Sequence, residues 1–168
     1  NGKGLEWNGT LTLVHPRGCE VSCEQVKKHK KPKSKLHLAV APTKNMQRLE
    51  WVLEKATEIG VTHITPLRCQ NAERKVIKQE RLEKICITAI KQSQQFYLPH
   101  VDPLTSFEQI LDSNAKAKYI AHCRSGSKIW LDAVQLPKNC IDVIILIGPE
   151  GDFSSEEIQR ALDMKYQA

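Results

Sequence analysis

The 168-residue chain is 40% hydrophobic and 26% charged, which is typical of a globular protein and excludes a disordered one. Its longest apolar run, residues 143–147, is far too short to cross a bilayer. No signal-peptide pattern opens the chain, so we expect a cytoplasmic protein. The formal net charge of +6 is typical of proteins with an anionic partner such as nucleic acid.

The cysteines show neither a CxxC pair nor a paired Cys/His ligand spacing. Several lie in apolar segments, where a free thiol behaves as a small hydrophobic group. We therefore predict buried, reduced thiols and no metal site for the six cysteines, which are Cys19, Cys23, Cys69, Cys86, Cys123 and Cys140.

The first part of the chain predicts a β-hairpin and a basic connection. Alternating segments at residues 10–14 and 19–26 indicate antiparallel strands, which are too little for an independent β-domain. The run KKHKKPKSK, residues 27–35, marks a solvated linker and a domain boundary. It is either a plain linker or a set of phosphate contacts, and the sequence favours neither reading. The lysines concerned are Lys27, Lys28, Lys30 and Lys31.

From residue 36 onward, the pattern predicts alternating strands and helices. Strands are expected at residues 36–41, 61–67, 119–123 and 141–147, and helices at 44–59, 79–94, 105–111 and 154–165. Gly60 ends the first helix where a left-handed residue is needed. The apolar stripe of this helix comprises Met46, Leu49, Val52, Leu53, Ala56 and Ile59. Such alternation predicts an α/β fold with a parallel sheet covered by helices.

Some polar positions break this pattern. Gln92 falls on the apolar stripe of the second helix, so its amide pairs with nearby backbone, lies at a fraying helix end or faces a polar site. Arg74, in the segment NAERKVIK, follows a predicted strand at the edge where open α/β sheets bind ligands. It is either a phosphate contact or part of a surface charge cluster. His122 is either a ligand contact or an ordinary strand histidine.

The segment LIGPEGDFSSEEI, residues 146–158, leads from a buried strand into a helix. Ser154 and Glu157 have the spacing of a capping box, which fixes the helix start. Gly148 and Gly151 permit unusual dihedrals or close backbone approach. Free amides at such a helix start suit a polar ligand.

The ligand expected at this segment is neutral or cationic. Glu150 and Asp152 place two negative charges in the loop, which argues against a phosphate cradle. Neither GxxxxGK[ST] nor GxGxxG is present.

Four stretches together resemble the RsmE family of bacterial methyltransferases, which belong to the SPOUT superfamily and act on 16S ribosomal RNA. They are LHLAVAPTKNMQRLEWVLEKATEIGVTHITPL, NAERKVIK, ERLEKICITAIKQS and LIGPEGDFSSEEI, in this order within residues 36–168. The resemblance implies a SPOUT domain with a deep trefoil knot over residues 36–168. It also implies that residues 1–35 are the end of a PUA-like β-barrel with a basic linker.

The resemblance further implies a homodimer that uses S-adenosylmethionine to methylate N3 of a decoding-region uridine in the small ribosomal subunit. It places Arg74 and Gln92 near the target base, with Glu150 as a candidate base by location. Lys44 and Lys75 join Arg74 as RNA contacts. The residues matched to the cofactor are His122, Cys123, Leu146, Ile147, Gly148, Pro149, Glu150 and Gly151.

Two departures from the family pattern stand out. Asp152 replaces the second glycine of the usual GPEGG. Relatives continue after the counterpart of the final DMKYQA with a strand, an LGxRILRxETA-like loop and a long helix, so we expect the knot, the cofactor pocket and the dimer interface to be incomplete here. Two alternatives remain, a non-catalytic RNA-binding module and a SPOUT methyltransferase that acts on transfer RNA.

Overall fold

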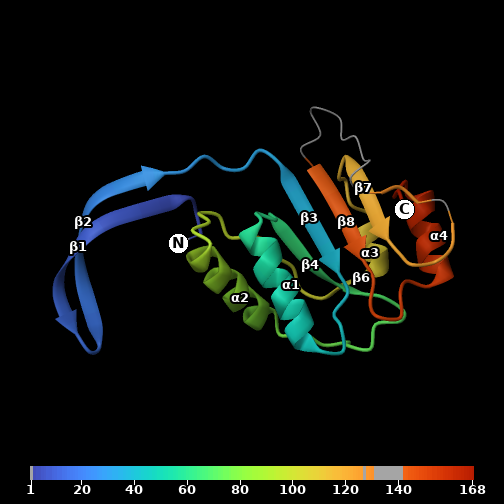
Figure 1. Cartoon of the computed structure of the whole chain (residues 1–168), viewed down its shortest axis with the longest axis horizontal. Coiled ribbons are helices and arrows are strands. Elements are labelled where there is room, and N and C mark those ends of the chain that lie inside the picture. Colours follow the sequence, from blue (N-terminus) through green and yellow to red (C-terminus); the bar gives the residue numbers. More distant parts are fainter. Residues whose placement is uncertain (1, 127, 131–141) are drawn as a thin grey trace.

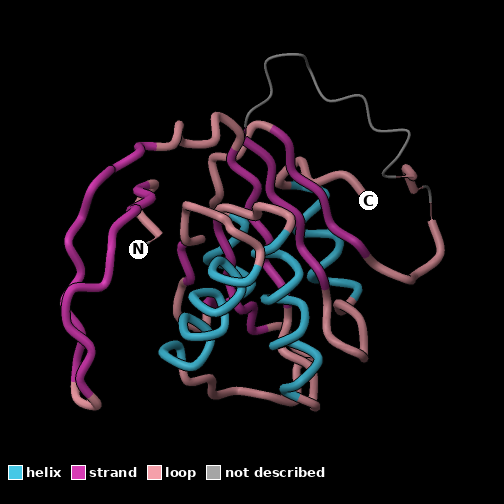
Figure 2. Tube along the Cα trace, turned by 60° about the vertical axis from the view of Figure 1, so that its left-hand side comes forward, coloured by secondary structure: helices cyan, strands magenta, loops and turns pink. Residues whose placement is uncertain are grey.

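The computed structural model describes residues 2–126, 128–130 and 142–168. Strands β1 (Leu5–His15) and β2 (Gly18–Lys28) form an antiparallel hairpin that stands away from the rest of the chain (Figures 1 and 2). Both strands are longer than predicted, and Lys27 and Lys28 belong to β2 rather than to a linker. Large apolar side chains such as Trp7, Leu11 and Val14 are exposed. The hairpin has no core of its own, and the barrel stays a prediction.

Contacts at the base of the hairpin hold it against the body. The amide of Gly4 donates to the carbonyl of Phe96 at 2.8 Å, and the hydroxyl of Tyr97 donates to the carbonyl of His29 at 2.9 Å. The His29 and Phe96 rings stack with centroids 3.4 Å apart. Segments at the start of the chain, after β2 and after α2 therefore form one anchor.

Replacing Gly4 by alanine is expected to break this anchor. Gly4 has a φ of +79°, and an added Cβ would collide with the ring and hydroxyl of Tyr97. We expect the free energy of unfolding to fall by about 1–3 kcal/mol and the His29 amide to exchange faster. Urea unfolding and hydrogen exchange measure both. Gly18→Ala is the matched control, because no atom lies within 4 Å of its added Cβ. Equal losses in the two variants would contradict the anchor.

The second sheet is parallel in every pair of strands. Its order is β5-β4-β3-β8-β7, with β6 pairing with β4. The strands are β3 (Lys35–Val40), β4 (His63–Arg68), β5 (His100–Val101), β6 (Thr105–Ser106), β7 (Ala117–Ala121) and β8 (Asp142–Ile147). Because the strands are parallel, their carboxyl ends meet at one edge (Figure 1).

Helices cover both faces of this sheet. The helices α1 (Met46–Glu58) and α2 (Gln79–Gln92) share one apolar core with residues of β3, β4 and β5. The helices α3 (Phe107–Leu111) and α4 (Ser155–Asp163) share another core with residues of β3, β4, β7 and β8. The predicted α/β class with a parallel sheet flanked by helices is confirmed, while the trefoil knot stays a prediction.

The helix ends and two burial predictions need correction. Gly60 has the expected left-handed conformation, with a φ of +91°, but Ile59 just before it is 78% exposed and lies outside the apolar stripe. The third helix starts at Phe107, because Thr105 and Ser106 pair with β4. Strand β8 is not buried on both faces, since Ile147 is 37% exposed.

The prediction of buried thiols is right for Cys69 and Cys86 and wrong for three others. Cys19 and Cys23 lie on the exposed hairpin, and Cys123 is exposed in the loop after β7. All five are free thiols, while Cys140 lies outside the described residues. Burial raises the pKa of the Cys69 and Cys86 thiols, so both remain protonated at neutral pH.

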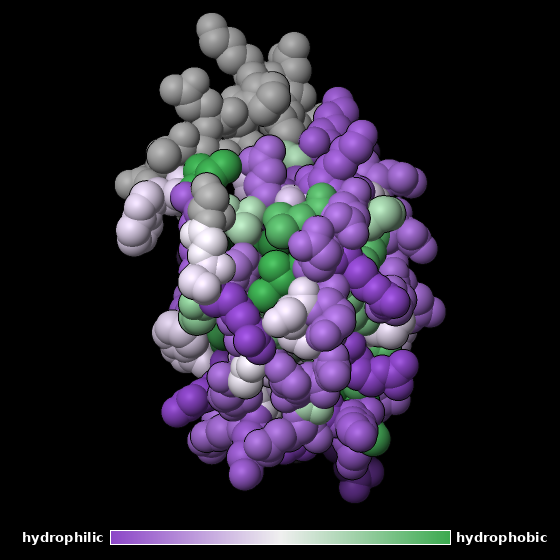
Figure 3. Space-filling view, turned by 90° about the vertical axis from the view of Figure 1, so that its right-hand side faces the viewer, coloured by the Kyte–Doolittle hydropathy of each residue, from purple (hydrophilic) through white to green (hydrophobic). Residues whose placement is uncertain are grey.

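The face seen in Figure 3 is mostly hydrophilic with a central group of exposed hydrophobic residues. Exposed apolar side chains in the carboxyl-terminal part of the chain include Ile147, Leu162 and Met164. Across the described ranges, no helix combines the length and apolar character needed to cross a membrane.

Candidate functional site

Loops that follow β3, β4, β7 and β8 gather at the carboxyl edge of the sheet (Figure 1). They comprise residues 41–45, 69–78, 122–126 and 148–154. In open α/β sheets, ligands bind outside the carboxyl ends of the strands. Hydrogen bonds between carboxylates and backbone amides join these loops.

Glu150 and Arg74 are brought together through the backbone of Lys44. Glu150 Oε1 accepts a hydrogen bond from the Lys44 amide at 3.0 Å, and Arg74 Nη2 donates to the Lys44 carbonyl at 2.9 Å. Lys44 Nζ lies 3.5 Å from a carboxylate oxygen of Glu73. A surface hollow of about 300 Å³ is lined by Lys44, Glu73, Arg74, Lys75 and Val76. Glu150 and Arg74, two of the predicted catalytic groups, therefore lie beside the predicted RNA contacts Lys44 and Lys75.

Asp152 joins the loops after β7 and β8. Its Oδ2 accepts from the amide of Cys123 at 2.8 Å, and its Oδ1 accepts from the amide of Phe153 at 2.8 Å. Its φ of +60° is left-handed, a conformation that aspartate tolerates better than most residues. Asn71 Nδ2 donates to the carbonyls of Gly151 and Asp152 at 3.2 and 3.0 Å. The aspartate thus adds a cross-loop contact.

Glu157 joins the loop after β4 to the start of α4. The predicted capping box is confirmed, because Ser154 Oγ accepts from the Glu157 amide and Glu157 Oε2 accepts from the Ser154 amide at 2.9 Å. The other oxygen, Oε1, accepts from the amide of Gln70 at 2.8 Å. The Glu157 side chain therefore accepts two backbone hydrogen bonds from different loops in a buried position.

The two glycines of the loop are required by close packing. A Cβ added at Gly148 would lie 3.0 Å from Phe153 Cδ2, and one at Gly151 would lie 3.3 Å from Asn71 Cβ. Neither glycine has a positive φ. The expectation of close approach is confirmed, but the neighbours are the chain's own side chains.

Two buried nitrogen atoms at this edge have no hydrogen-bond partner among the described residues. They are His122 Nδ1 and Arg74 Nε. A buried polar atom without a partner costs roughly 1–3 kcal/mol, which a bound polar ligand would recover. The sequence predicted a strand that includes His122 and Cys123. In the structure β7 ends at Ala121, so both residues follow the strand. His122 Nδ1 after β7 and Arg74 Nε after β4 are therefore two positions at this edge where a polar ligand could bind.

Some predicted site residues lie elsewhere or in the core. Gln92 is exposed as the last residue of α2, which Figure 1 shows near the amino terminus. The interpretation of a glutamine at a helix end is therefore confirmed, and that of a buried amide is wrong. Because α2 ends at Gln92, this side chain does not pack against the apolar core. Leu146 is fully buried, which leaves only its backbone for a ligand. Ile147 ends β8, and Pro149 lies in the loop that follows.

The basic residues form two separate groups. Lys30 and Lys31 are exposed in the connection before β3, near Lys27 and Lys28 at the end of β2. Lys44, Arg74 and Lys75 lie at the other end of β3. The structure therefore does not bring the two groups into one site.

The fold defines an α/β protein with a candidate ligand site at the carboxyl edge of a parallel sheet. The model of the RNA methyltransferase domain family matches residues 29–168. The chain belongs to this family, in agreement with the resemblance found in the sequence.

Curated relatives are named ribosomal RNA small subunit methyltransferase E. The protein from Mesomycoplasma hyopneumoniae is 32% identical over 152 residues, which cover 86% of this chain and 64% of the relative. The protein from Rickettsia conorii is 26% identical over 159 residues, which cover 95% of this chain and 65% of the relative. The chain thus spans less than two thirds of the length of these relatives.

Solved structures have the same fold. A probable rRNA-methyltransferase from Porphyromonas gingivalis has a TM-score of 0.89 at 33% identity, with 99% of this chain and 71% of that chain covered. A putative methyltransferase from Legionella pneumophila in complex with the cofactor SAM has a TM-score of 0.86 at 30% identity. This match covers 99% of this chain and 70% of that chain.

Proposed function

We propose that the chain is the main part of an S-adenosylmethionine-dependent methyltransferase that modifies ribosomal RNA of the small subunit. The match to the RNA methyltransferase domain family over residues 29–168 carries this proposal. It is supported by the names of the curated relatives and by the SAM complex of the Legionella relative. The loop cluster with unpartnered His122 Nδ1 and Arg74 Nε provides the polar surface that such a ligand requires.

When bound, S-adenosylmethionine supplies an electrophilic methyl group on a sulfonium. We assign its contacts to the loops after β7 and β8, with His122 and Cys123 on one side. On the other side lie Ile147 to Gly151, together with the backbone of Leu146. Asp152 holds these two sides together through the Cys123 amide. This contact orients the site before a ligand arrives, which lowers the ordering cost of binding.

The proposed acceptor is N3 of a decoding-region uridine. The new N3–methyl bond forms as the sulfur–methyl bond breaks, and the N3 proton must pass to a base. Glu150 is the candidate base, although its Oε1 already accepts from the Lys44 amide. Arg74 stabilises the developing anion or holds a phosphate. Gln92 lies away from these groups in this chain, and its catalytic role stays a prediction.

RNA binding is assigned to the two basic groups, with Lys44, Arg74 and Lys75 next to the reacting base. Lys27, Lys28, Lys30 and Lys31 would bind phosphates farther along the RNA. The predicted homodimer remains part of the proposal. The exposed Ile147, Leu162 and Met164 supply apolar surface that a second copy could cover.

Two variants test the proposal in the protein that carries this chain. His122→Ala is expected to weaken S-adenosylmethionine binding roughly tenfold, because a single hydrogen bond is worth about 1 kcal/mol or more. Arg74→Ala is expected to lower methyl transfer to small ribosomal subunits at least tenfold and to leave cofactor affinity within about threefold. Calorimetry and transfer of labelled methyl groups measure these effects. Arg48→Ala, at an exposed arginine of α1, is the charge-matched control.

The outcomes separate the alternatives. Salt-sensitive RNA binding without any cofactor binding would identify a non-catalytic RNA-binding module, which the exposed lysines of the β2–β3 connection favour. Methyl transfer to transfer RNA in preference to small subunits would identify a transfer-RNA enzyme. Absence of label from subunits that lack the modification would refute the substrate assignment.

A further inference from the structure

Three histidines form a row across neighbouring strands, on the part of the sheet opposite to the loop cluster. The register pairs His37 of β3 with His63 of β4, and His63 with His100 of β5. Residues in register on parallel strands project from the same face of the sheet. His63 and His100 open their strands, so the row lies toward the amino edge.

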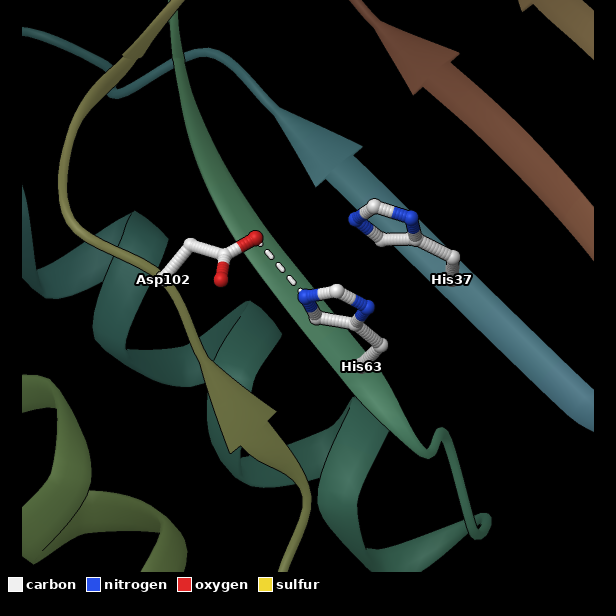
Figure 4. A group of neighbouring side chains, drawn as sticks. All are labelled: His37, His63 and Asp102. Carbon is white, nitrogen blue, oxygen red and sulfur yellow. Dashed lines mark hydrogen bonds and ion pairs between the residues drawn. The ribbon is translucent and has the colours of Figure 1, made fainter. Parts of the chain in front are cut away.

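Asp102 and Thr65 form the next row on this face and join the histidines. Asp102 Oδ2 accepts from His63 Nε2 at 2.7 Å and from the Thr65 hydroxyl at 2.5 Å, and Oδ1 lies 3.0 Å from His100 Nε2. His37 Nε2 lies 2.6 Å from the same Thr65 hydroxyl. Since this hydroxyl donates its proton to Asp102, it accepts from His37. Figure 4 shows both imidazoles on the same side of β3 and β4, with Asp102 beside His63.

The arrangement provides the donor atoms of a transition-metal site. One ligand atom each from His37, His63 and Asp102 lies within 4.8 Å of the others. Two imidazoles and a carboxylate suit a borderline cation such as Zn²⁺, which holds nitrogen and oxygen ligands at about 2.0–2.2 Å. The His37 and His63 rings are stacked and nearly parallel, with centroids 3.8 Å apart, so both Nε2 edges face the same side. One of the two rings must turn about its χ angles for both lone pairs to meet at one ion.

Solvent can reach the cluster. The His63 and Asp102 side chains are 34% and 24% exposed, which leaves access from solvent.

We propose that this chain binds a divalent transition-metal ion of the zinc class through His37 Nε2, His63 Nε2 and Asp102 Oδ2. In the metal-free chain the Thr65 hydroxyl connects His37 to Asp102. Rotation of this hydroxyl opens the space, and the imidazole protons move to Nδ1 as Nε2 becomes a ligand. His100 is within reach as a fourth ligand through its contact with Asp102.

The ion would join β3, β4 and β5, so its role is structural. The sequence predicted no metal site, because its cysteines and short spacings match no ligand pattern. Consecutive ligands of this cluster are 26 and 39 residues apart, and they meet only through strand register.

The test uses tag-free protein titrated with Zn²⁺ in the presence of a competing chelator. We expect one equivalent to bind, and His37→Gln or Asp102→Asn to weaken binding at least 100-fold. His15→Gln, at an exposed histidine of the hairpin, is the matched control and should bind as the unchanged chain does. Far-UV circular dichroism verifies that each variant is folded. Zn²⁺ should also raise the melting temperature of the unchanged chain but not of the two ligand variants.

Two results would overturn the proposal. One is equal Zn²⁺ affinity in the unchanged chain and the His37→Gln variant, which would leave a hydrogen-bonded network only. The other is loss of binding on replacement of the exposed Cys19 and Cys23 by serine, which would place the ion on the hairpin. Cofactor affinity should be unchanged in His37→Gln, so this test stands apart from the proposed methyl transfer.

Discussion

Replacing Phe153 by alanine is expected to lower the free energy of unfolding by about 3–5 kcal/mol, which is the usual cost of removing a fully buried phenyl group. Phe153 has no exposed surface, and its ring centroid lies 5.5 Å from that of Phe107 on α3. The ring also fills the space above Gly148, where a Cβ would be only 3.0 Å away. The alanine variant therefore loses core packing and leaves the loop after β8 without its anchor.

Urea unfolding followed by circular dichroism measures this loss. Phe153→Leu conserves most of the volume and is expected to cost about 1.5 kcal/mol or less. Trp51→Ala removes a larger aromatic group that is 59% exposed on α1, and its cost should stay below about 1 kcal/mol. A cost for Phe153→Ala that is no greater than that for Trp51→Ala would contradict the packing described for the loop.

Local patterns in the sequence were sufficient for much of the fold. The helix stop at Gly60 and the capping box of Ser154 and Glu157 depend on residues a few positions apart, and both are confirmed. Periodicity failed at the ends of helices. The stripe continues through Ile59 and Gln92 in the sequence, but the backbone leaves the helix at those points and both side chains are exposed.

Contacts between distant loops were not predictable in the same way. Asp152 was noted for its negative charge and as a departure from the expected GPEGG, but its hydrogen bond to the Cys123 amide spans 29 residues. The pairing of His37 with His63 depends on the register of two parallel strands, which a spacing of 26 residues does not specify. Neighbours of this kind become visible only when the sheet order is known.

Replacing Glu157 by alanine is expected to lower the free energy of unfolding by about 2–4 kcal/mol. The carboxylate accepts backbone hydrogen bonds from Gln70 and Ser154 at 2.8 and 2.9 Å. Hydrogen bonds to charged groups contribute roughly 1.5–3 kcal/mol each, and in the variant water compensates part of this loss. The variant loses both a helix cap and the connection between the loops after β4 and β8. Cofactor affinity should therefore fall together with stability.

Glu156→Ala separates these effects from a simple loss of negative charge at the helix start. Glu156 lies in the same first turn of α4 but is exposed, so its removal should change stability far less than removal of Glu157 does. Glu157→Gln keeps one acceptor oxygen and should fall between the two, because its amide group cannot accept from the second N–H. Chemical denaturation of the three variants gives this ranking. Equal losses for Glu156→Ala and Glu157→Ala would show that charge alone matters, and that the connection through the Gln70 amide contributes nothing to the loop cluster.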